Sequence, residues 1–165
     1  MSYFDHGFEG PICWHDVGSD KYQYAVVYLP EDLVGDLPLK EHPRLRVEGE
    51  IAEMPFNGAW IPAKGIWYLM VPKEIRESVS LSVGDMVEVR FSVADQDHVD
   101  MPDELIALLK QDKAFAKRWD ALTPGKQRGY AYLVSSAKQN ATRVKRAQKA
   151  ADLLAKGLGP NGRPL

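Results

Sequence analysis

The sequence predicts an α+β protein in which a β-rich unit with an internal duplication is followed by a small helical module. Residues 1–98 contain short runs rich in Val, Ile, Tyr and Trp that are separated by Gly and Pro, as the strands of a small sheet are. Residues 99–157 instead repeat apolar side chains at helical spacing. The charge changes near the same border, because residues 1–100 carry a net charge of −10 and residues 101–165 a net charge of +8.

Length and composition exclude several classes of protein. A chain of this length buries roughly 70% of its unfolded surface and needs no disulfide to fold. The single cysteine, Cys13, excludes an internal disulfide and fits a reducing compartment. No apolar run reaches the roughly 18 residues of a membrane span, and residues 1–10 lack the basic and apolar pattern of a signal peptide. We therefore expect a cytoplasmic protein without a membrane span.

The opposite charges of the two parts have two explanations. Either the parts attract each other across an interface, or the basic part faces an acidic partner. The first explanation is favoured, because the contrast lies within one short chain.

Four segments of the first part are predicted to be strands. Apolar and polar residues alternate most clearly in residues 44–51 and 86–91, as is typical of half-buried antiparallel strands. The predicted strands lie within residues 22–29, 44–54, 65–71 and 86–93.

A shift of 42 residues aligns the first part with itself. Pro30 then falls on Pro72, and a series of apolar positions coincides without a gap. The coinciding pairs are Leu33 with Ile75, Leu37 with Val79, Leu39 with Leu81, Leu45 with Val87, Val47 with Val89, and Ile51 with Val93. Each copy reads as a strand, a proline, a short amphipathic helix with an acidic start, and a second strand. Two such copies predict one barrel with a pseudo-twofold axis, and they favour a monomer.

Residues 71–91, VPKEIRESVSLSVGDMVEVRF, resemble the proline, helix and GD-x-V-x-V segment of a small bacterial double-split β-barrel domain of unknown function. The resemblance implies a barrel related in shape to antitoxins and transition-state regulators. In this barrel Gly84 and Asp85 are expected to form the turn before the last strand, since Gly tolerates a positive φ and Asp caps its own turn. Family members carry a glycine-containing hairpin where Ala52 and Glu53 stand here, so no function of that hairpin is carried over.

Four short helices are predicted in the second part, and they predict a compact bundle or a helical cap on the barrel. Gly157 is expected to end the last helix, and residues 158–165 to form a flexible tail. The helix starts are predicted from residues that favour the first turn or the N-cap position, namely Pro102, Asp112, Thr123-Pro124 and Asn140.

Residues 101–157 resemble the family called bacteriocin-protection, YdeI or OmpD-associated. The most specific match is the pattern A-K-x-x-x-T-R-x-x-R, carried by Ala137, Lys138, Thr142, Arg143 and Arg146. The resemblance implies a protective role against antimicrobial peptides and implies no particular molecular activity. We expect no cofactor and no metal.

The last predicted helix, within residues 140–157, is strongly basic. At about 100° per residue, Lys145, Lys149 and Lys156 lie together and form a solvated face. No aromatic residues interleave these lysines, so base stacking with a nucleic acid is not supported, and the apolar face is too lean for a membrane surface. The opposite, apolar arc is predicted to contain Val144, Ala147, Ala151, Leu154 and Ala155.

Arg143 falls at the edge of the packing side of this helix. A guanidinium there needs a carboxylate or carbonyl partner. Two interpretations stay open: Arg143 ties the helical module to the acidic barrel, or it binds an anion.

Three apparent catalytic patterns carry little weight. Residues 135–138 match S-x-x-K, but the companion motifs of that enzyme class are absent. Residues 157–162 match G-x-G-x-x-G, yet they follow a helix and contain a proline, so no nucleotide-binding unit forms. His6, Cys13, His15 and Asp16 could in principle bind a metal or form a thiolate–imidazole pair, although a strand-edge cysteine and surface histidines are favoured.

The aromatic residues Phe56, Trp60, Trp67 and Tyr68 are expected to be barrel core and cross-strand pairs. A groove between the barrel and the helices, lined by these rings and Arg143, is the default hypothesis for a ligand site if a pocket is present there. The candidate ligand or anion-binding residues are Lys138, Thr142, Arg143, Arg146, Trp67 and Tyr68.

The sequence supports three hypotheses about function. The leading hypothesis is a non-enzymatic cytoplasmic protein that binds an unidentified small ligand or protein partner and is linked to protection against bacteriocins. The alternative is a nucleic-acid-binding regulator, which is less favoured because the barrel part is acidic. A third hypothesis, a small hydrolase or redox enzyme that uses Cys13 and His15, predicts loss of activity in Cys13→Ala.

Overall fold

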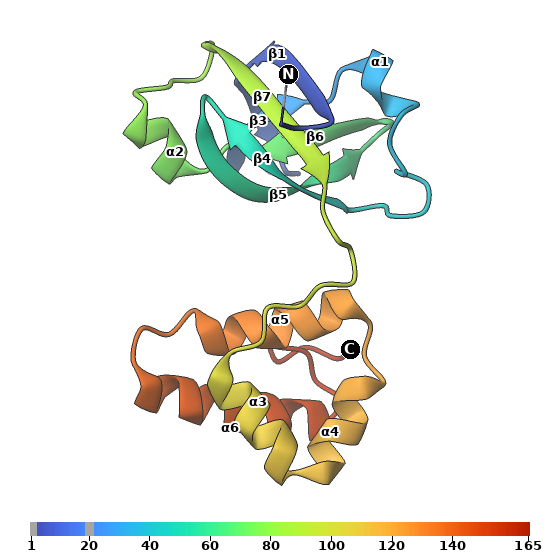
Figure 1. The fold of residues 1–165 in the computed structure, drawn as a ribbon, viewed down its shortest axis with the longest axis vertical. Coiled ribbons are helices and arrows are strands. Elements are labelled where there is room, and N and C mark those ends of the chain that lie inside the picture. The colour runs from blue at the N-terminus through green and yellow to red at the C-terminus, as the bar shows by residue number, and fades with distance from the viewer. Residues whose placement is uncertain (1–2, 19–21) are drawn as a thin grey trace. The chain divides into compact units, whose positions relative to one another are not determined.

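The computed structural model describes residues 3–18 and 22–165 and confirms the α+β class. The chain forms two compact units, Met1–Gln96 and Asp97–Leu165, which are described separately (Figure 1). Within residues 3–18 and 22–165, the strands and two short helices lie in the first unit, and four helices lie in the second. Each unit has its own apolar core.

In the described residues, the first unit is a curled antiparallel sheet of seven strands. Neighbouring strands are hydrogen-bonded in the order β1-β7-β4-β5-β6-β3-β2. The four segments predicted from the sequence correspond to β3, β4, β6 and β7. The strands are β1 (His6–Pro11), β2 (Cys13–Asp16), β3 (Gln23–Tyr28), β4 (Leu45–Ile51), β5 (Met54–Ala63), β6 (Ile66–Met70) and β7 (Met86–Val93).

Ile12 closes the curl of this sheet. β1 and β2 are the two ends of the strand order, yet Ile12 alone separates them in the chain. The backbone N–H of Ile12 donates to the carbonyl of Asp85, and the Ile12 carbonyl accepts from the N–H of Gly84. Because Ile12 is also 1% exposed, this junction anchors both ends of the sheet on the apolar core.

Two short helices follow β3 and β6, as the 42-residue shift predicts. They are α1 (Glu31–Val34) and α2 (Lys73–Ser78), and each is preceded by a proline. Pro30 has φ −59° and ψ 140°, and Pro72 has φ −57° and ψ 142°. Both prolines therefore occupy the extended position immediately before the helix rather than its first turn. The internal duplication requires this order of strand, proline and helix in both copies. The duplication itself stays a prediction.

The core of the first unit is formed by buried residues of the strands β3 to β7, of α2 and of the adjoining loops, together with Ile12. The aromatic residues Trp60, Phe56 and Phe91 are among its buried members, so the prediction that the first two are core is confirmed. Trp60 and Phe91 contact each other edge to face, with ring centroids 5.5 Å apart. Such pairs add roughly 0.5–1.5 kcal/mol to the burial of the rings.

Two turns identified in the sequence differ in strain. Gly84 has φ +99°, and the Asp85 carboxylate accepts from the N–H of Ser82, so the predicted Gly–Asp turn before β7 is confirmed. Ala52 and Glu53 join β4 to β5 with φ of +49° and +65°. Left-handed geometry at both central residues matches the turn type that normally selects Asn-Gly, so this hairpin is strained by its own residues.

The second unit contains α3 (Asp103–Gln111), α4 (Lys113–Asp120), α5 (Pro124–Ser135) and α6 (Asn140–Ala155), and α6 contacts the other three. The predicted caps at Asp112 and Thr123 are confirmed, since their side chains accept from the N–H groups of Phe115 and Lys126. The predicted cap at Asn140 is wrong. Gln139 takes the cap position, and the Asn140 side chain bonds to Glu104 instead. Pro102 likewise lies one residue before the helix that it was expected to begin, because its ψ of 143° is extended.

Gly157 ends α6, as predicted, with φ +70°. The N–H groups of Gly157 and Leu158 bond to the carbonyls of Leu154 and Leu153, which is the Schellman arrangement. Residues 158–165 then fold back: the Tyr130 hydroxyl donates to the carbonyl of Leu158, and Leu165 N–H donates to the carbonyl of Gly157. The segment expected to be a tail is thus attached to the helices by hydrogen bonds.

The buried arc of α6 differs from the predicted one. Val144 is 53% exposed and Ala155 is also exposed, whereas Ala150 is fully buried. The arc is therefore rotated by about 40° toward Arg143, at 100° per residue. This rotation brings Arg143 against the end of α5 and leaves Val144 on the surface.

Candidate functional site: a groove between two parallel helices

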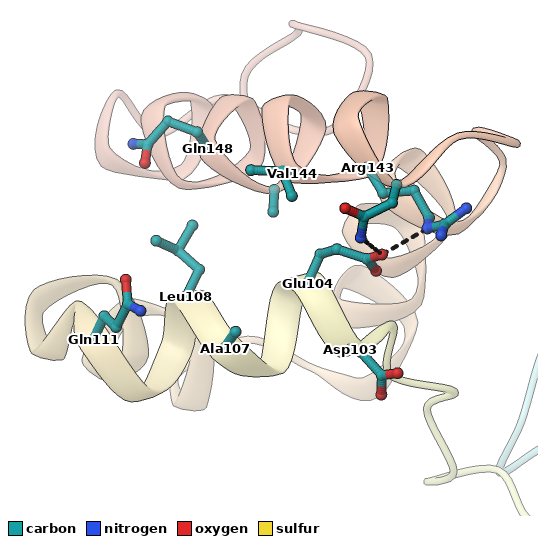
Figure 2. Close-up of a pocket in the computed structure, with 10 residues that line it drawn as sticks. Asp103, Glu104, Ala107, Leu108, Gln111, Arg143, Val144 and Gln148 are labelled. Atoms are coloured by element: carbon teal, nitrogen blue, oxygen red, sulfur yellow. Dashed lines mark hydrogen bonds and ion pairs between the residues drawn. The ribbon is translucent and has the colours of Figure 1, made fainter.

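A groove of about 640 Å³ runs between α3 and α6. The two helices run in the same direction along it, with Glu104 and Arg143 at one end and Gln111 and Gln148 at the other (Figure 2). Leu108 and Val144 project into it from opposite walls. The lining residues repeat at helical spacing on both helices; they are Asp103, Glu104, Ala107, Leu108, Gln111, Asn140, Arg143, Val144, Ala147 and Gln148.

The groove lies next to the face of α3 that packs in the core, and Leu108 at the border contacts both. Leu105 points inward and is fully buried, whereas Ala107, two residues on, is exposed. Residues at positions 103, 104, 107, 108 and 111 share one side of a helix. That side is apolar in the middle and polar at both ends, so it suits a ligand with an apolar centre.

Glu104 fixes the polar end of the groove. One carboxylate oxygen accepts from Nε of Arg143 at 2.8 Å and from Nδ2 of Asn140 at 2.7 Å. The Arg143 hydrogen bond, helped by the backbone N–H of Glu104, holds the pKa of this carboxyl below its ordinary value despite the opposing effect of burial. The Glu104 side chain is 9% exposed and that of Arg143 is 27% exposed, so the pair is largely screened from water.

Arg143 also binds the loop between α5 and α6. Its Nη1 donates to the carbonyl of Ala137 at 3.2 Å and to that of Lys138 at 2.8 Å. The predicted need for a carboxylate or carbonyl partner is therefore confirmed. The carboxylate belongs to Glu104, in the same unit, so the interaction described here does not use the acidic barrel.

Arg146 lies about one turn after Arg143 on α6 and binds the C-terminal end of α5. Its Nη1 donates to the carbonyl of Leu133 at 3.1 Å and to the Ser136 hydroxyl at 2.9 Å. A cation at the C-terminal end of α5 also complements the negative end of the helix dipole. The two arginines of the A-K-x-x-x-T-R-x-x-R pattern thus hold the end of α5 against α6.

The remaining residues of that pattern contribute less to the groove. The Lys138 side chain is exposed, and only its carbonyl binds Arg143. Thr142 is half-buried on the first turn of α6 and does not line the groove.

Trp67 and Tyr68 lie in the first unit, on opposite faces of β6. Trp67 lines a cavity of about 500 Å³ beside α1, and its buried Nε1 has no hydrogen-bond partner among the residues described. Tyr68 lines a different cavity of about 600 Å³ and stacks on His15, with ring centroids 4.3 Å apart. The two rings therefore line different cavities in the structure.

Cys13 and His15 are both on β2, and each has a different partner. The Cys13 thiol donates to the carbonyl of Pro11 at 3.6 Å, and Nδ1 of His15 is 2.9 Å from the Tyr28 hydroxyl. Burial, together with Cys13 and two neighbouring residues, raises the pKa of the Tyr28 phenol. In the part of the chain that the structure covers, no hydrogen bond joins Cys13 to His15, and no three His, Cys, Asp or Glu side chains gather as a metal site would require.

The sequence did not identify the main groove residues. Glu104 was not among the candidate residues, and Val144 was assigned to the core. Leu108 contacts both the core and the groove. The spacing of Asp103, Ala107 and Gln111 is a signal for a second helix face, but it does not reveal which neighbour that face meets.

Comparisons with known proteins agree with this two-unit architecture. Residues 8–91 match the family model of a domain of unknown function, DUF1905, and residues 98–157 match the model described as bacteriocin-protection, YdeI or OmpD-associated. Both resemblances seen in the sequence are therefore confirmed. Because the first match spans just over half of the chain, the protein belongs to the DUF1905 family, and its helical unit is similar to the bacteriocin-protection model. A search of curated proteins found no match.

The helices were also compared with the requirements of a membrane span. Of the helices in residues 3–18 and 22–165, none combines the length and apolar character needed to cross a bilayer.

Proposed function

We propose that this chain is a non-catalytic binding protein of the cytoplasm that contributes to protection against bacteriocins, and that the α3–α6 groove is its binding site. The observation that carries the proposal is Val144, an apolar side chain that is 53% exposed at the centre of the groove. Single exposed apolar residues are common on protein surfaces. Val144, however, faces Leu108 across a groove, and the polar end of this groove is held by the Glu104–Arg143 hydrogen bond. Such an arrangement favours the binding of an apolar surface from a partner.

The chemistry of the groove supports binding rather than catalysis. Arg143 and Asn140 are both engaged by Glu104, and the low pKa of Glu104 makes this carboxylate a poor general base near neutral pH. Among the residues that the structure describes, no Ser, Cys, Thr, His or Lys side chain lines the groove. The name of the matched helical family supports the link to bacteriocins.

A complementation assay tests this proposal. Bacteria that lack the gene would receive the wild-type chain, Val144→Asn, or the control Tyr132→Asn, which alters an exposed residue outside the groove. Survival would then be measured in the presence of a peptide bacteriocin, at matched protein levels. We expect the wild type and the control to protect and Val144→Asn to fail, and full protection by Val144→Asn would contradict the proposal.

One observation favours the nucleic-acid alternative. Lys145, Lys149 and Lys156 are exposed along α6, away from its buried residues, as predicted. The net charge of −10 in residues 1–100 opposes this reading. A gel-retardation titration discriminates between the two, because phosphate binding by lysines strengthens steeply as salt is lowered. We expect no retardation at low salt.

A further inference from the structure

We infer that the α3–α6 groove takes one amphipathic helix from a partner peptide, with apolar anchors along one face and a basic side chain at the end that meets Asp103. This inference rests on the proposed function, because it names the class of partner for the same groove. It follows from the dimensions of the groove, its apolar centre and its charge.

The dimensions suit a short helix. The lining residues extend over residues 103–111 of α3 and 140–148 of α6, which is about 12 Å along each axis at 1.5 Å per residue. A helix that lies between two others presents anchors at positions i, i+3, i+4 and i+7, which cover a similar length. A bound helix would complete a three-helix arrangement around the exposed Val144.

The apolar centre supplies the anchor positions. Leu108 and Val144 face each other across the groove, with Ala107 and Ala147 beside them. The alanines leave room for larger side chains of a partner, because a small residue on one side accommodates a large one on the other. Leucine-like anchors therefore fit better than a polar or extended chain.

The charge of the groove is opposite to that of the unit around it. Residues 101–165 have a net charge of +8, yet Asp103 and Glu104 line the groove and no lysine does so among the residues that the structure describes. Of the described residues that line the groove, Arg143 alone is basic, and Glu104 and two carbonyls already bind it. Asp103 is exposed and takes part in none of the ion pairs found in the described parts of the chain. A cationic side chain of the partner would complement this carboxylate.

A binding assay with the full chain tests the inference. The probe is a fluorescein-labelled amphipathic peptide of about 14 residues, with leucines at helical spacing and lysine in its terminal turns. A second peptide has the same composition and a proline at its centre, which breaks the helix. Fluorescence anisotropy would give Kd for both, and amide chemical shifts would locate the site. We expect the helical peptide to bind at least tenfold more tightly and to shift the amides of Ala107, Leu108 and Val144.

Variants make the test specific. Val144→Asn should weaken binding of the helical peptide about tenfold, since it removes an apolar side chain that the bound peptide would cover. Asp103→Asn should weaken binding severalfold at low salt and reduce its salt dependence. Tyr132→Asn, on an exposed position of α5, should leave Kd unchanged.

Three outcomes would overturn the inference. They are equal affinity for the helical and the proline peptide, amide shifts outside the groove, and a chain dimer that Val144→Asn dissociates, because a second copy would then be the occupant. The inference and the proposed function can fail separately. Helix binding without any effect of Val144→Asn on survival contradicts only the protective function, and an effect on survival without helix binding contradicts only the class of partner.

Discussion

Gly49 in β4 lies directly opposite Phe91 in β7, and the two residues are 42 positions apart. Val27 in β3 lies opposite Leu69 in β6, again 42 positions apart. A twofold axis that exchanges residue n with residue n+42 would map each of these antiparallel pairs onto itself. The strand register is therefore the one that two copies of a strand–helix–strand unit would adopt around a common axis.

The first prediction concerns the close approach at Gly49. A Cβ atom at this position would lie 1.9 Å from the carbonyl oxygen of Arg90 and 2.7 Å from Cα of Phe91, so the backbone of β7 would have to move. We expect Gly49→Ala to lower the free energy of unfolding by about 1–3 kcal/mol or more, as overpacking does. Chemical denaturation measures this loss. Gly35→Ala is the matched control, because a Cβ at Gly35 meets nothing within 4 Å and its φ of −68° is ordinary; equal stability of the two variants would contradict the expected clash.

The second prediction concerns the β4–β5 hairpin. Glu53 has φ +65° at the second central position of its turn, where the β5–β6 hairpin has Gly65 with φ +85°. Because a left-handed residue with a side chain costs roughly 1–2 kcal/mol, Glu53→Gly should raise the free energy of unfolding, with a gain of up to about 1 kcal/mol after the loss of chain entropy. Thermal unfolding would show a higher midpoint. A lower midpoint would mean that the Glu53 side chain stabilises the turn by more than its backbone strain costs.

The third prediction separates structure from binding in the arginine pattern. Arg146 donates to Leu133 and Ser136 and does not line the groove. Arg146→Met should therefore destabilise the chain by about 1.5–3 kcal/mol, the range for hydrogen bonds of a charged group. The folded fraction of this variant should still bind the helical peptide with wild-type Kd. Loss of affinity without loss of stability would show that Arg146 belongs to the binding site.

The fourth prediction concerns pH. The pKa of Glu104 is held below its ordinary value of 4.5 by Arg143, so in acid the unfolded chain takes up this proton before the folded chain does. The stabilisation is complete above the unfolded pKa and is lost as pH falls through the folded pKa. Glu104→Gln should therefore be less stable than wild type at neutral pH, and the difference should shrink as pH falls below about 4.5. Denaturation curves across this range would measure it, and a constant difference would contradict the role assigned to the Arg143 hydrogen bond.

The sequence predicted the fold where local signals are strong. Period-two alternation located β4 and β7, and the caps at Asp112 and Thr123 located α4 and α5. β1 was not predicted, because its segment HGFEGP has no β-branched residues and its partner β7 is about 80 positions away in the chain. Long-range pairing of this kind depends on the rest of the barrel, so the residues of the segment alone do not predict it.

The candidate site was predicted only in part, again because its contacts join residues that are distant in the sequence. The position of Arg143 on its helix showed that it needs a partner, but Glu104 is 39 residues away and lies on another helix. The placement of Val144 in the core was wrong, because the contact of α6 with α5 rotates the buried arc by about 40°. A helical pattern rich in alanine allows such a rotation, since small side chains define the buried face only weakly.

The proposed binding site requires a groove between α3 and α6 that is open in the free chain, and the reactivity of a thiol at its centre measures this opening. Val144→Cys in a Cys13→Ser background would be labelled with a maleimide, with Tyr132→Cys as an exposed reference. We predict that the two thiols react at similar rates and that a saturating helical peptide slows only the thiol at position 144. A thiol at position 144 that is protected in the free, monomeric chain would contradict the account, because the groove would then be covered by another part of the same molecule.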